Sequence, residues 1–435
     1  MNNMHSTNHN DKRYIEDPGA MMAEHPNMYK WIQAAILVLG VWLITSPMTF
    51  SYNNSLMLWS DVLSGVAMVG IAVFSLKVPK MAWVTYVNAL VGVWLLLAPL
   101  AFWASNPAIY ANDTLIGMLL ITFSFVIPMS MSMPGPDVPP GWSYNPSTWI
   151  QRAPIIVLGL IGFFLSRPMA AYQLGYIDSV WDPFFSGIAG NGTETVLTSD
   201  VSKAWPISDA GLGAAVYLIE VLSTFMGDQR RWRTMPWMVA IFGIAVIPLG
   251  ITSIVLVIMQ PVMVGAWCTL CLIAAAAMLM MIPLAIDEVV AMIQFLNHSR
   301  KQGKSVWTTF IRGGNLPDAT EIPQEDRKPA WNVPSMVWGV TSSWNLWLSS
   351  ALGVWLMFTP AVFGIVKQSA AADNAHLIGA LIVTMAMIAL AEVGRAARWI
   401  NGSTSASGLG SSRELGFWQA PRSQPDGTWQ SSVLF

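Results

Sequence analysis

Residues 234–286 read TMPWMVAIFGIAVIPLGITSIVLVIMQPVMVGAWCTLCLIAAAAMLMMIPLAI and contain no charged residue. A transmembrane helix needs about 20 apolar residues, so this stretch is too long for a single span. It predicts two membrane helices, broken near Gln260-Pro261. We therefore expect an all-α integral membrane protein.

The composition of the whole chain agrees with a membrane setting. Hydrophobic residues make up 54% and charged residues 11%, whereas soluble domains carry about 25% charged residues. The 22 tryptophans are typical of aromatic belts at the two membrane surfaces. The net charge of -2 and the lack of a basic block with interleaved aromatics exclude a nucleic acid partner. Membrane lipid is the predicted surrounding.

Apolar runs of spanning length recur along the chain, and they predict about ten transmembrane helices. The first run begins only at Trp31 and has no small-residue cleavage site, so it is read as a retained span rather than a signal peptide. The predicted helices lie near 31–49, 58–76, 82–104, 113–131, 153–172, 210–227, 236–259, 265–285, 341–364 and 375–395.

The basic residues predict how these helices are oriented. An even number of spans puts both termini on one side, and cytoplasmic loops carry the excess of Lys and Arg. Arg167, Lys203 and Lys367 fall on one side of the predicted spans, and the other 19 of the 22 Lys and Arg fall on the opposite side. Both termini are therefore predicted to be cytoplasmic, with Cys268 on the outer side.

One motif occurs three times. It reads GVWLITSPMTF from Gly40, GVWLLLAPLAF from Gly92 and GVWLMFTPAVF from Gly353. About 25 residues later come SDVLSG, NDTLIG and NAHLIG, so each repeat is a pair of spans joined by an outer loop. Gly permits close helix packing and Pro ends or kinks a helix. These residues indicate a structural or partner-docking role rather than chemistry.

The repeats resemble the SPW repeat of prokaryotic membrane proteins. The resemblance covers about 31–131 and 341–395, and only the first copy has the literal Ser-Pro, at Ser46-Pro47. It implies a prokaryotic cell membrane as the location.

Cys268 and Cys271 are the only cysteines in the chain. Cysteines at i and i+3 share one face of a helix and can form a disulfide, and a helix N-terminus favours the thiolate. We expect Cys268 to be the more accessible thiol, able to meet a protein thiol. Cys271 lies one turn deeper, where a diffusing quinone could reach it. An outer location tolerates disulfides.

Three alternatives compete with a redox-active pair. Zinc needs about four ligands, and the chain has no further cysteine, so no metal is expected. A static disulfide across four residues stabilises little. Two inert packing cysteines would not need a helix start. Redox activity is the favoured interpretation.

The central unit, about 150–300, resembles the vitamin K epoxide reductase family. The resemblance rests on VWDPFF (180–185), VLTSDVSKAWPISDAGLGAAVYLIE (196–220) and WCTLC (267–271). It implies a four-helix bundle around a quinone. In that family's arrangement Cys271 would form an adduct or charge-transfer contact with the quinone, and Cys268 would exchange disulfides with a relay.

The chain departs from the family at two places. Many members carry a second cysteine pair in the first outer loop, but residues 175–209 contain none, so an internal relay is impossible. Members that act on vitamin K often have Tyr a turn after CxxC, where this chain has LIAAAAM (272–278). Reduction of an epoxide is therefore not expected.

Five further residues are candidates for binding the substrate. Ser199 aligns with a polar loop position near the family's active site, and Tyr217 could hydrogen-bond a quinone oxygen. Glu220 lies about 15 Å into its span, where an acid either carries protons or bonds a neighbouring helix. Trp181 and Phe185 either cover the site or anchor their loop in the membrane interface.

These observations together predict a membrane thiol–quinone oxidoreductase. It would oxidise external thiols, those of a thioredoxin-like partner, and pass electrons to ubiquinone or menaquinone. A non-enzymatic membrane scaffold with a vestigial CxxC is the alternative. The expected parts are a cytoplasmic segment (1–30), two repeats (31–131), the central unit (150–300), a cytoplasmic linker (301–340), a third repeat (341–395) and a flexible tail (401–435).

Overall fold

The computed structural model describes residues 26–78, 84–129, 138–142, 144–187, 190–314, 333–366 and 368–392. Within them, ten helices have 17 residues or more, one at each predicted place. They are α3 (Pro26–Thr45), α4 (Ser55–Lys77), α5 (Thr85–Ala101), α6 (Pro107–Met129), α7 (Trp149–Gln173), α10 (Asp209–Phe225), α12 (Pro236–Met259), α13 (Thr269–Lys301), α16 (Trp344–Val362) and α17 (Ala370–Ile388). Residues 1–25 of the predicted segment 1–30, residues 315–332 of the predicted linker 301–340 and the predicted tail 401–435 lie outside the described residues.

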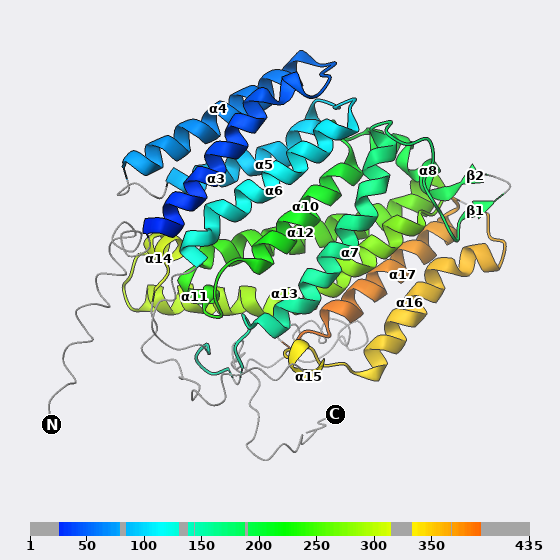
Figure 1. The fold of residues 1–435 in the computed structure, drawn as a ribbon. Coiled ribbons are helices and arrows are strands. Elements are labelled where there is room, and N and C mark those ends of the chain that lie inside the picture. The colour runs from blue at the N-terminus through cyan, green and yellow to red at the C-terminus, as the bar shows by residue number, and fades with distance from the viewer. Residues whose placement is uncertain are drawn as a thin grey trace, which may run out of the picture.

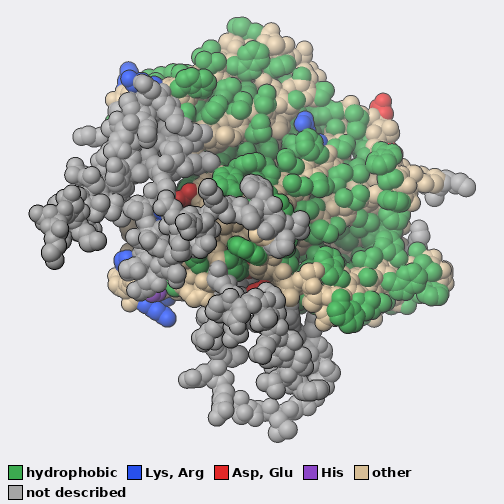
Figure 2. Space-filling model, turned by 60° about the horizontal axis from the view of Figure 1, so that its bottom comes forward, with side chains coloured by type: hydrophobic (Ala, Val, Ile, Leu, Met, Phe, Trp, Pro, Cys, Tyr) green, Lys and Arg blue, Asp and Glu red, His purple; other side chains and the backbone are tan. Residues whose placement is uncertain are grey.

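Eight of the described helices are long and apolar enough to cross a membrane. The other two, α5 and α10, have 17 residues each, and both pack against neighbouring long helices, α5 on α6 and α10 on α7. Figure 2 shows apolar side chains covering broad areas of the helices' surface, as expected where lipid is the solvent. The predicted all-α membrane fold is confirmed.

The short elements lie between the long helices. They are η1 (Ser46–Met48), β1 (Ser186–Gly187), β2 (Gly190–Asn191), α8 (Gly192–Leu197), α9 (Asp200–Lys203), α11 (Arg231–Thr234), η3 (Gln260–Val264), α14 (Val306–Arg312) and α15 (Val333–Met336). β1 and β2 form an antiparallel hairpin in the loop between α7 and α10.

Several helix starts differ from the prediction because polar side chains cap the helices earlier. Asn54 accepts a hydrogen bond from the N–H of Leu56 and starts α4, and Asn106 does the same for Ala108 at the start of α6. Ser369 accepts from the N–H of Ala372 at the start of α17. An N-cap side chain satisfies a backbone donor that the helix leaves free.

The helices form a central bundle with hairpins on two sides (Figure 1). In the bundle, α7 packs against α10 and α13, and α12 packs against α13 and α10. The hairpins α3–α4 and α5–α6 contact one another and reach the bundle through α5 and α6 on α10. The hairpin α16–α17 lies on the other side, where α17 contacts α12 and α13.

In each of the three hairpins, the two helices cross at an equivalent pair of glycines, one on each helix. A Cβ built on Gly65 would lie 2.7 Å from the carbonyl oxygen of Gly40, and one on Gly117 would lie 2.7 Å from that of Gly92. In the third hairpin the corresponding distance, from Gly379 to the Gly353 oxygen, is 2.6 Å. No other residue fits these crossings without moving the backbones apart, so the three hairpins pack by one common contact.

The uncharged stretch breaks where the sequence predicted. Helix α12 ends at Met259, η3 makes a π-helical turn over Gln260–Val264, and Gly265 follows with a left-handed φ of 72°. Helix α13 then begins at Thr269 rather than at the predicted residue 265.

Helix α13 does not end near residue 285, where the sequence predicted the end of this span. The helix continues to Lys301 and has 33 residues, about 50 Å at 1.5 Å per residue. Asp287 and Glu288 are buried mid-helix, where Asp287 accepts a hydrogen bond from Tyr144 (2.7 Å) and Glu288 pairs with Arg231 (2.5 Å). Partners from distant segments let these acids remain inside a continuous helix.

The same end of the bundle contains buried arginines. Arg231 also donates to the carbonyl oxygens of Ser223 (2.5 Å) and Met226 (2.9 Å), and Arg152 donates to that of Gly227 (2.9 Å). Both side chains are almost fully buried. They therefore hold the ends of α7, α10 and α13 together, in addition to contributing positive charge on that side.

Candidate active site

The loop between α7 and α10 covers the end of the bundle where α13 begins. It runs over residues 174–208, described except for 188–189, and contains β1, β2, α8 and α9. Val180 and Leu197 from this loop form one apolar cluster with Met169 of α7, Cys268 and Leu270. The cysteines therefore lie beneath the loop rather than at a bare helix end.

Cys268 and Cys271 form a disulfide at the start of α13, with their Cα atoms 5.3 Å apart. Cys268 is the N-cap residue, and its sulfur accepts a hydrogen bond from the N–H of Cys271 at 3.0 Å. The N–H of Cys268 donates to Oε1 of Gln260 at 3.0 Å. The predicted position at a helix start is confirmed, and one of the N–H groups that a helix start leaves free, that of Cys271, points at the sulfur of Cys268.

The expectation that Cys268 is the more accessible cysteine is wrong. Its side chain is 0% exposed, whereas Cys271 is partly exposed. Position along the helix suggested the opposite order, but the loop and α7 pack over the helix end. The thioether sulfur of Met169 lies 3.9 Å from the sulfur of Cys268 and 3.5 Å from that of Cys271.

Asp182 fastens the loop to the cysteine turn. Its carboxylate accepts hydrogen bonds from the N–H groups of Phe185 (2.9 Å) and Thr193 (2.9 Å), and from the hydroxyl of Thr193 (2.7 Å). It also accepts one from the hydroxyl of Thr269, the residue next to Cys268. Burial opposes ionisation of Asp182, but the hydrogen bonds from Thr269, Phe185 and Thr193 outweigh it and lower its pKa to about 2.

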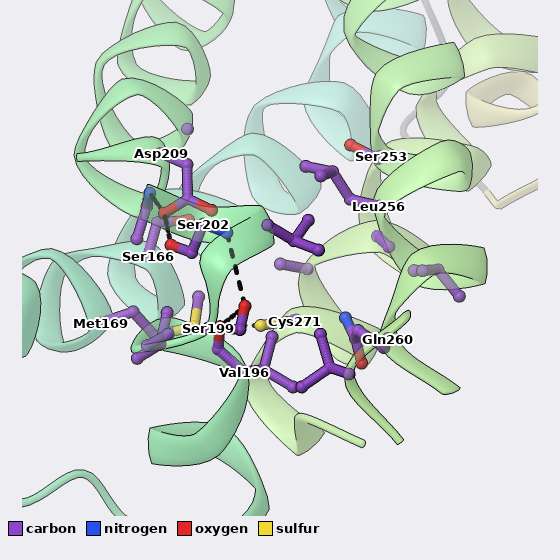
Figure 3. A pocket seen from close by; sticks show the side chains of 18 of the residues that line it. Ser166, Met169, Val196, Ser199, Ser202, Asp209, Ser253, Leu256, Gln260 and Cys271 are labelled. Carbon is purple, nitrogen blue, oxygen red and sulfur yellow. Dashed lines mark hydrogen bonds between the residues drawn. The ribbon is translucent and has the colours of Figure 1, made fainter. Parts of the chain in front are cut away.

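A cavity of about 120 Å³ lies beside the disulfide (Figure 3). Its wall includes Cys271 but not Cys268, together with Met169, Ser199, Tyr217 and Gln260. An apolar cavity of about 150 Å³ is known to hold one benzene ring. The room beside Cys271 is therefore close to that of one six-membered ring.

Three polar groups on the cavity wall are free to act as donors. Among the described residues, the hydroxyls of Ser166 and Ser253 and the amide nitrogen of Gln260 have no hydrogen-bond partner, although all three residues line the cavity. The oxygen of the Gln260 amide is used by Cys268, which leaves the nitrogen on the other side (Figure 3). A ligand with carbonyl oxygens would satisfy these donors.

Residues 153–286 match the sequence model of the vitamin K epoxide reductase family, and residues 30–127 match that of the SPW repeat domain. We call residues 153–286 the vitamin K epoxide reductase unit, after the family that they resemble. The family is one of membrane oxidoreductases that couple thiol–disulfide chemistry to quinones. No curated protein and no solved structure matches the chain. The third repeat, 341–395, lies outside the matched range and shares the glycine crossing of the other two.

Two predicted substrate-binding residues of the vitamin K epoxide reductase unit lie on the cavity wall. Ser199 caps α9, and its hydroxyl donates to the carbonyl oxygen of Val196 at 2.7 Å. Tyr217 packs against α7 at Gly162, and its hydroxyl donates to the carbonyl oxygen of Ala274 at 2.7 Å. Both hydroxyl protons therefore have partners already.

Glu220 does not line this cavity. It lies in α10, 0% exposed, and neither carboxylate oxygen has a hydrogen-bond partner among the described residues. Trp181 is 74% exposed and also lies away from the cavity.

Phe185 belongs to the loop, and its ring packs against the third hairpin. Its ring stacks with that of Trp267 (centroids 6.4 Å apart) and with that of Phe358 on α16 (6.3 Å). Phe185 therefore packs beside the cysteine turn without lining the cavity.

Three further residues of the site, Gln260, Met169 and Asp182, were not predicted from the sequence. Gln260 is the only Asn or Gln between 234 and 286, and a lone amide in an apolar stretch is the signal that marks it as a candidate. Met169 and Asp182 carried no such signal, because an apolar residue in a span and an acid in a loop are both common. The described residues contain no group of three or more His, Cys, Asp or Glu side chains able to hold a metal ion.

Proposed function

We propose that this protein is a membrane thiol:quinone oxidoreductase, which oxidises thiols on the outer side and passes their electrons to a membrane quinone. The observation that carries the proposal is the position of Cys271. Its sulfur belongs to a disulfide at a helix start and faces a ring-sized cavity with unused donors. The family match supports quinone as the partner of that disulfide.

The residues of the cavity fit a quinone ring. Gln260, Ser166 and Ser253 offer hydrogen-bond donors for carbonyl oxygens, and Tyr217 and Met169 offer apolar surface for the ring. When bound, the quinone supplies a two-electron acceptor. The chain's own groups orient its oxygens and keep water out.

The cysteines carry the exchange. A thiolate of the external dithiol attacks the sulfur of Cys268, the Cys268–Cys271 bond breaks, and Cys271 is released as a thiolate facing the cavity. The second thiol of the dithiol then attacks the mixed disulfide, leaves with an intramolecular disulfide and frees Cys268. The two cysteines give two electrons and two protons to the quinone and close their own disulfide again.

The loop must move before a protein thiol reaches Cys268, because that sulfur is fully buried. The loop contains no cysteine that could relay electrons. The thiol partner, for which we propose a thioredoxin-like protein, therefore reacts with Cys268 itself after residues 180–197 open.

We further propose that both termini are cytoplasmic and that the membrane is a prokaryotic cell membrane. Helix α13 starts at the disulfide and ends with His298, Arg300 and Lys301 in its last turn. Positive charge favours the cytoplasmic side, so the disulfide lies at the outer side. An impermeant maleimide applied to intact cells after reduction should label the cysteines; labelling only after lysis would contradict this orientation.

The activity is tested with purified full-length protein, dithiothreitol and menadione, by following quinone absorbance. Cys271→Ser should abolish quinone reduction. Cys268→Ser should block disulfide exchange while Cys271 stays able to react with quinone. If the doubly substituted protein, Cys268→Ala/Cys271→Ala, reduces quinone as fast as the wild type, the redox function is wrong and a membrane scaffold is the better description.

A further inference from the structure

A second cavity, of about 220 Å³, lies between the vitamin K epoxide reductase unit and the third hairpin. Four helices form its wall, with Val257 from α12, Ala276 from α13, Met357 from α16, and Ala380 and Thr384 from α17. The hydroxyl of Thr384 donates to the carbonyl oxygen of Ala380 at 2.8 Å. No polar side chain on this wall is therefore left for a ligand, and the cavity suits a hydrocarbon.

The second cavity adjoins the cavity at Cys271. Val257 and Ala275 line both of them. They belong to neighbouring helices, and Ala275 contributes only a methyl side chain to the wall that the two spaces share. The run of alanines at 274–277 explains why the wall is thin here: Ala274 and Ala275 face the first cavity, and Ala275 and Ala276 face the second.

The third hairpin is held in place beside the disulfide. The ring of Trp267, the residue before Cys268, lies 5.1 Å from that of Phe358 and 5.5 Å from that of His376. Gln368, between α16 and α17, donates to the carbonyl oxygen of Met263 at 3.1 Å. The wall that α16 and α17 supply is thus fixed relative to the cavity at Cys271.

We propose that the second cavity binds the isoprenoid tail of the quinone whose ring occupies the cavity at Cys271. This inference rests on the proposed function. Membrane quinones carry an apolar chain on the ring, and a ring beside Cys271 needs an apolar exit for that chain. The adjoining cavity is larger than the first, lacks free polar side chains and meets it at Val257 and the small side chain of Ala275. The third hairpin then selects quinones by their tails.

The test compares two quinones that share a ring: a menaquinone with its isoprenoid tail, and menadione, which has none. The readout is the ratio of kcat/KM for the two with dithiothreitol as reductant. Ala276→Phe places a ring in the second cavity from an exposed position on its wall. We expect Ala276→Phe to lower the ratio of kcat/KM for menaquinone to that for menadione at least about tenfold. In an apolar pocket, a difference of one or a few methylenes changes kcat/KM by about that factor.

The matched control is Ile273→Phe, on the same helix, exposed and outside both cavities; it should keep the wild-type ratio. Ala380→Leu fills the cavity from the opposite wall and should act as Ala276→Phe does. An unchanged ratio in both cavity variants overturns the tail site. The tail site is also overturned if Ala276→Phe loses a phospholipid that co-purifies with the wild type while the ratio stays unchanged. That result would assign the second cavity to a lipid. If the wild type reduces neither quinone, the proposed function itself fails.

Discussion

The hydroxyl of Thr269 donates a hydrogen bond to the carboxylate of Asp182. Thr269 lies between the two cysteines, and Asp182 lies in the loop that covers them. The same carboxylate binds backbone N–H groups of Phe185 and Thr193. One side chain thus joins the fold of the loop to the turn that holds the disulfide, so the loop and the access to Cys268 are coupled.

Asp182→Asn should speed reduction of the disulfide by small thiols. The variant loses one acceptor oxygen and the charge, and a hydrogen bond to a charged group contributes about 1.5–3 kcal/mol. A loss of about 1.4 kcal/mol in loop closure raises the open population tenfold. The measurement is the rate at which dithiothreitol makes the cysteines available to an alkylating reagent, followed by mass.

Asp178→Asn is the control for that experiment, because Asp178 is exposed in the same loop and has no hydrogen-bond partner among the described residues. It should react at the wild-type rate. Equal rates for Asp182→Asn and the wild type would show that the loop does not limit access to Cys268.

The contribution of Asp182 should also depend on pH. Its pKa is lowered to about 2 in the folded protein, from about 3.9 in an unfolded chain. The stabilisation is therefore complete above about pH 4 and is lost as the pH falls towards 2. Melting temperatures of the wild type and Asp182→Asn in detergent should differ by a constant amount from pH 7 to about 4 and converge below. A gap that widens in acid would contradict the assignment.

The SPW repeats allow a test within one helix. A Cβ on Gly65 would meet the Gly40 carbonyl oxygen at 2.7 Å, whereas one on Gly70 meets nothing within 4 Å. Both lie in α4. Gly65→Ala should destabilise by about 1–3 kcal/mol, as overpacking does, and Gly70→Ala should be neutral or stabilise by up to about 1 kcal/mol. Thermal unfolding in detergent measures both, and equal effects would mean that α3 and α4 do not depend on close contact.

The buried pair of Arg231 and Glu288 should be sensitive to loss of one partner. Arg231→Met leaves the buried carboxylate of Glu288 with the hydroxyl of Ser147 as its remaining side-chain hydrogen-bond partner among the described residues, and an uncompensated buried charge costs about 3–5 kcal/mol. Arg312→Met, at an exposed position, is the control and should change stability little. Adding Glu288→Leu to Arg231→Met should recover much of the loss, because the double variant has no unpaired charge.

The ten helices could be predicted because lipid requires long apolar runs, and the chain shows each run plainly. The burial of Cys268 could not, because it depends on how residues 174–208 fold back over the bundle. The uncharged stretch stops before Asp287 and Glu288, and a span ending near residue 285 was predicted, yet these two acids find partners, Tyr144 and Arg231, in segments far away in sequence. Local pattern predicted the elements, and long-range polar pairing decided where α13 ends.

Gln260 should have two separable roles. Its amide oxygen accepts from the N–H of Cys268 at 3.0 Å, and its amide nitrogen is the free donor on the cavity wall. Gln260→Glu keeps an acceptor for Cys268 but removes the donor, so we expect KM for quinone to rise about two- to tenfold, the value of one hydrogen bond, with little change in the melting temperature.

Gln260→Leu removes both groups and leaves the N–H of Cys268 without its acceptor. An unsatisfied buried donor costs about 1–3 kcal/mol, so this variant should lose stability as well as quinone affinity. Steady-state kinetics with menadione and melting temperatures in detergent, taken together, separate the two effects. If Gln260→Glu has the KM of the wild type while Gln260→Leu loses activity, Gln260 acts only by holding the backbone of Cys268, and the quinone oxygens take their hydrogen bonds from Ser166 and Ser253.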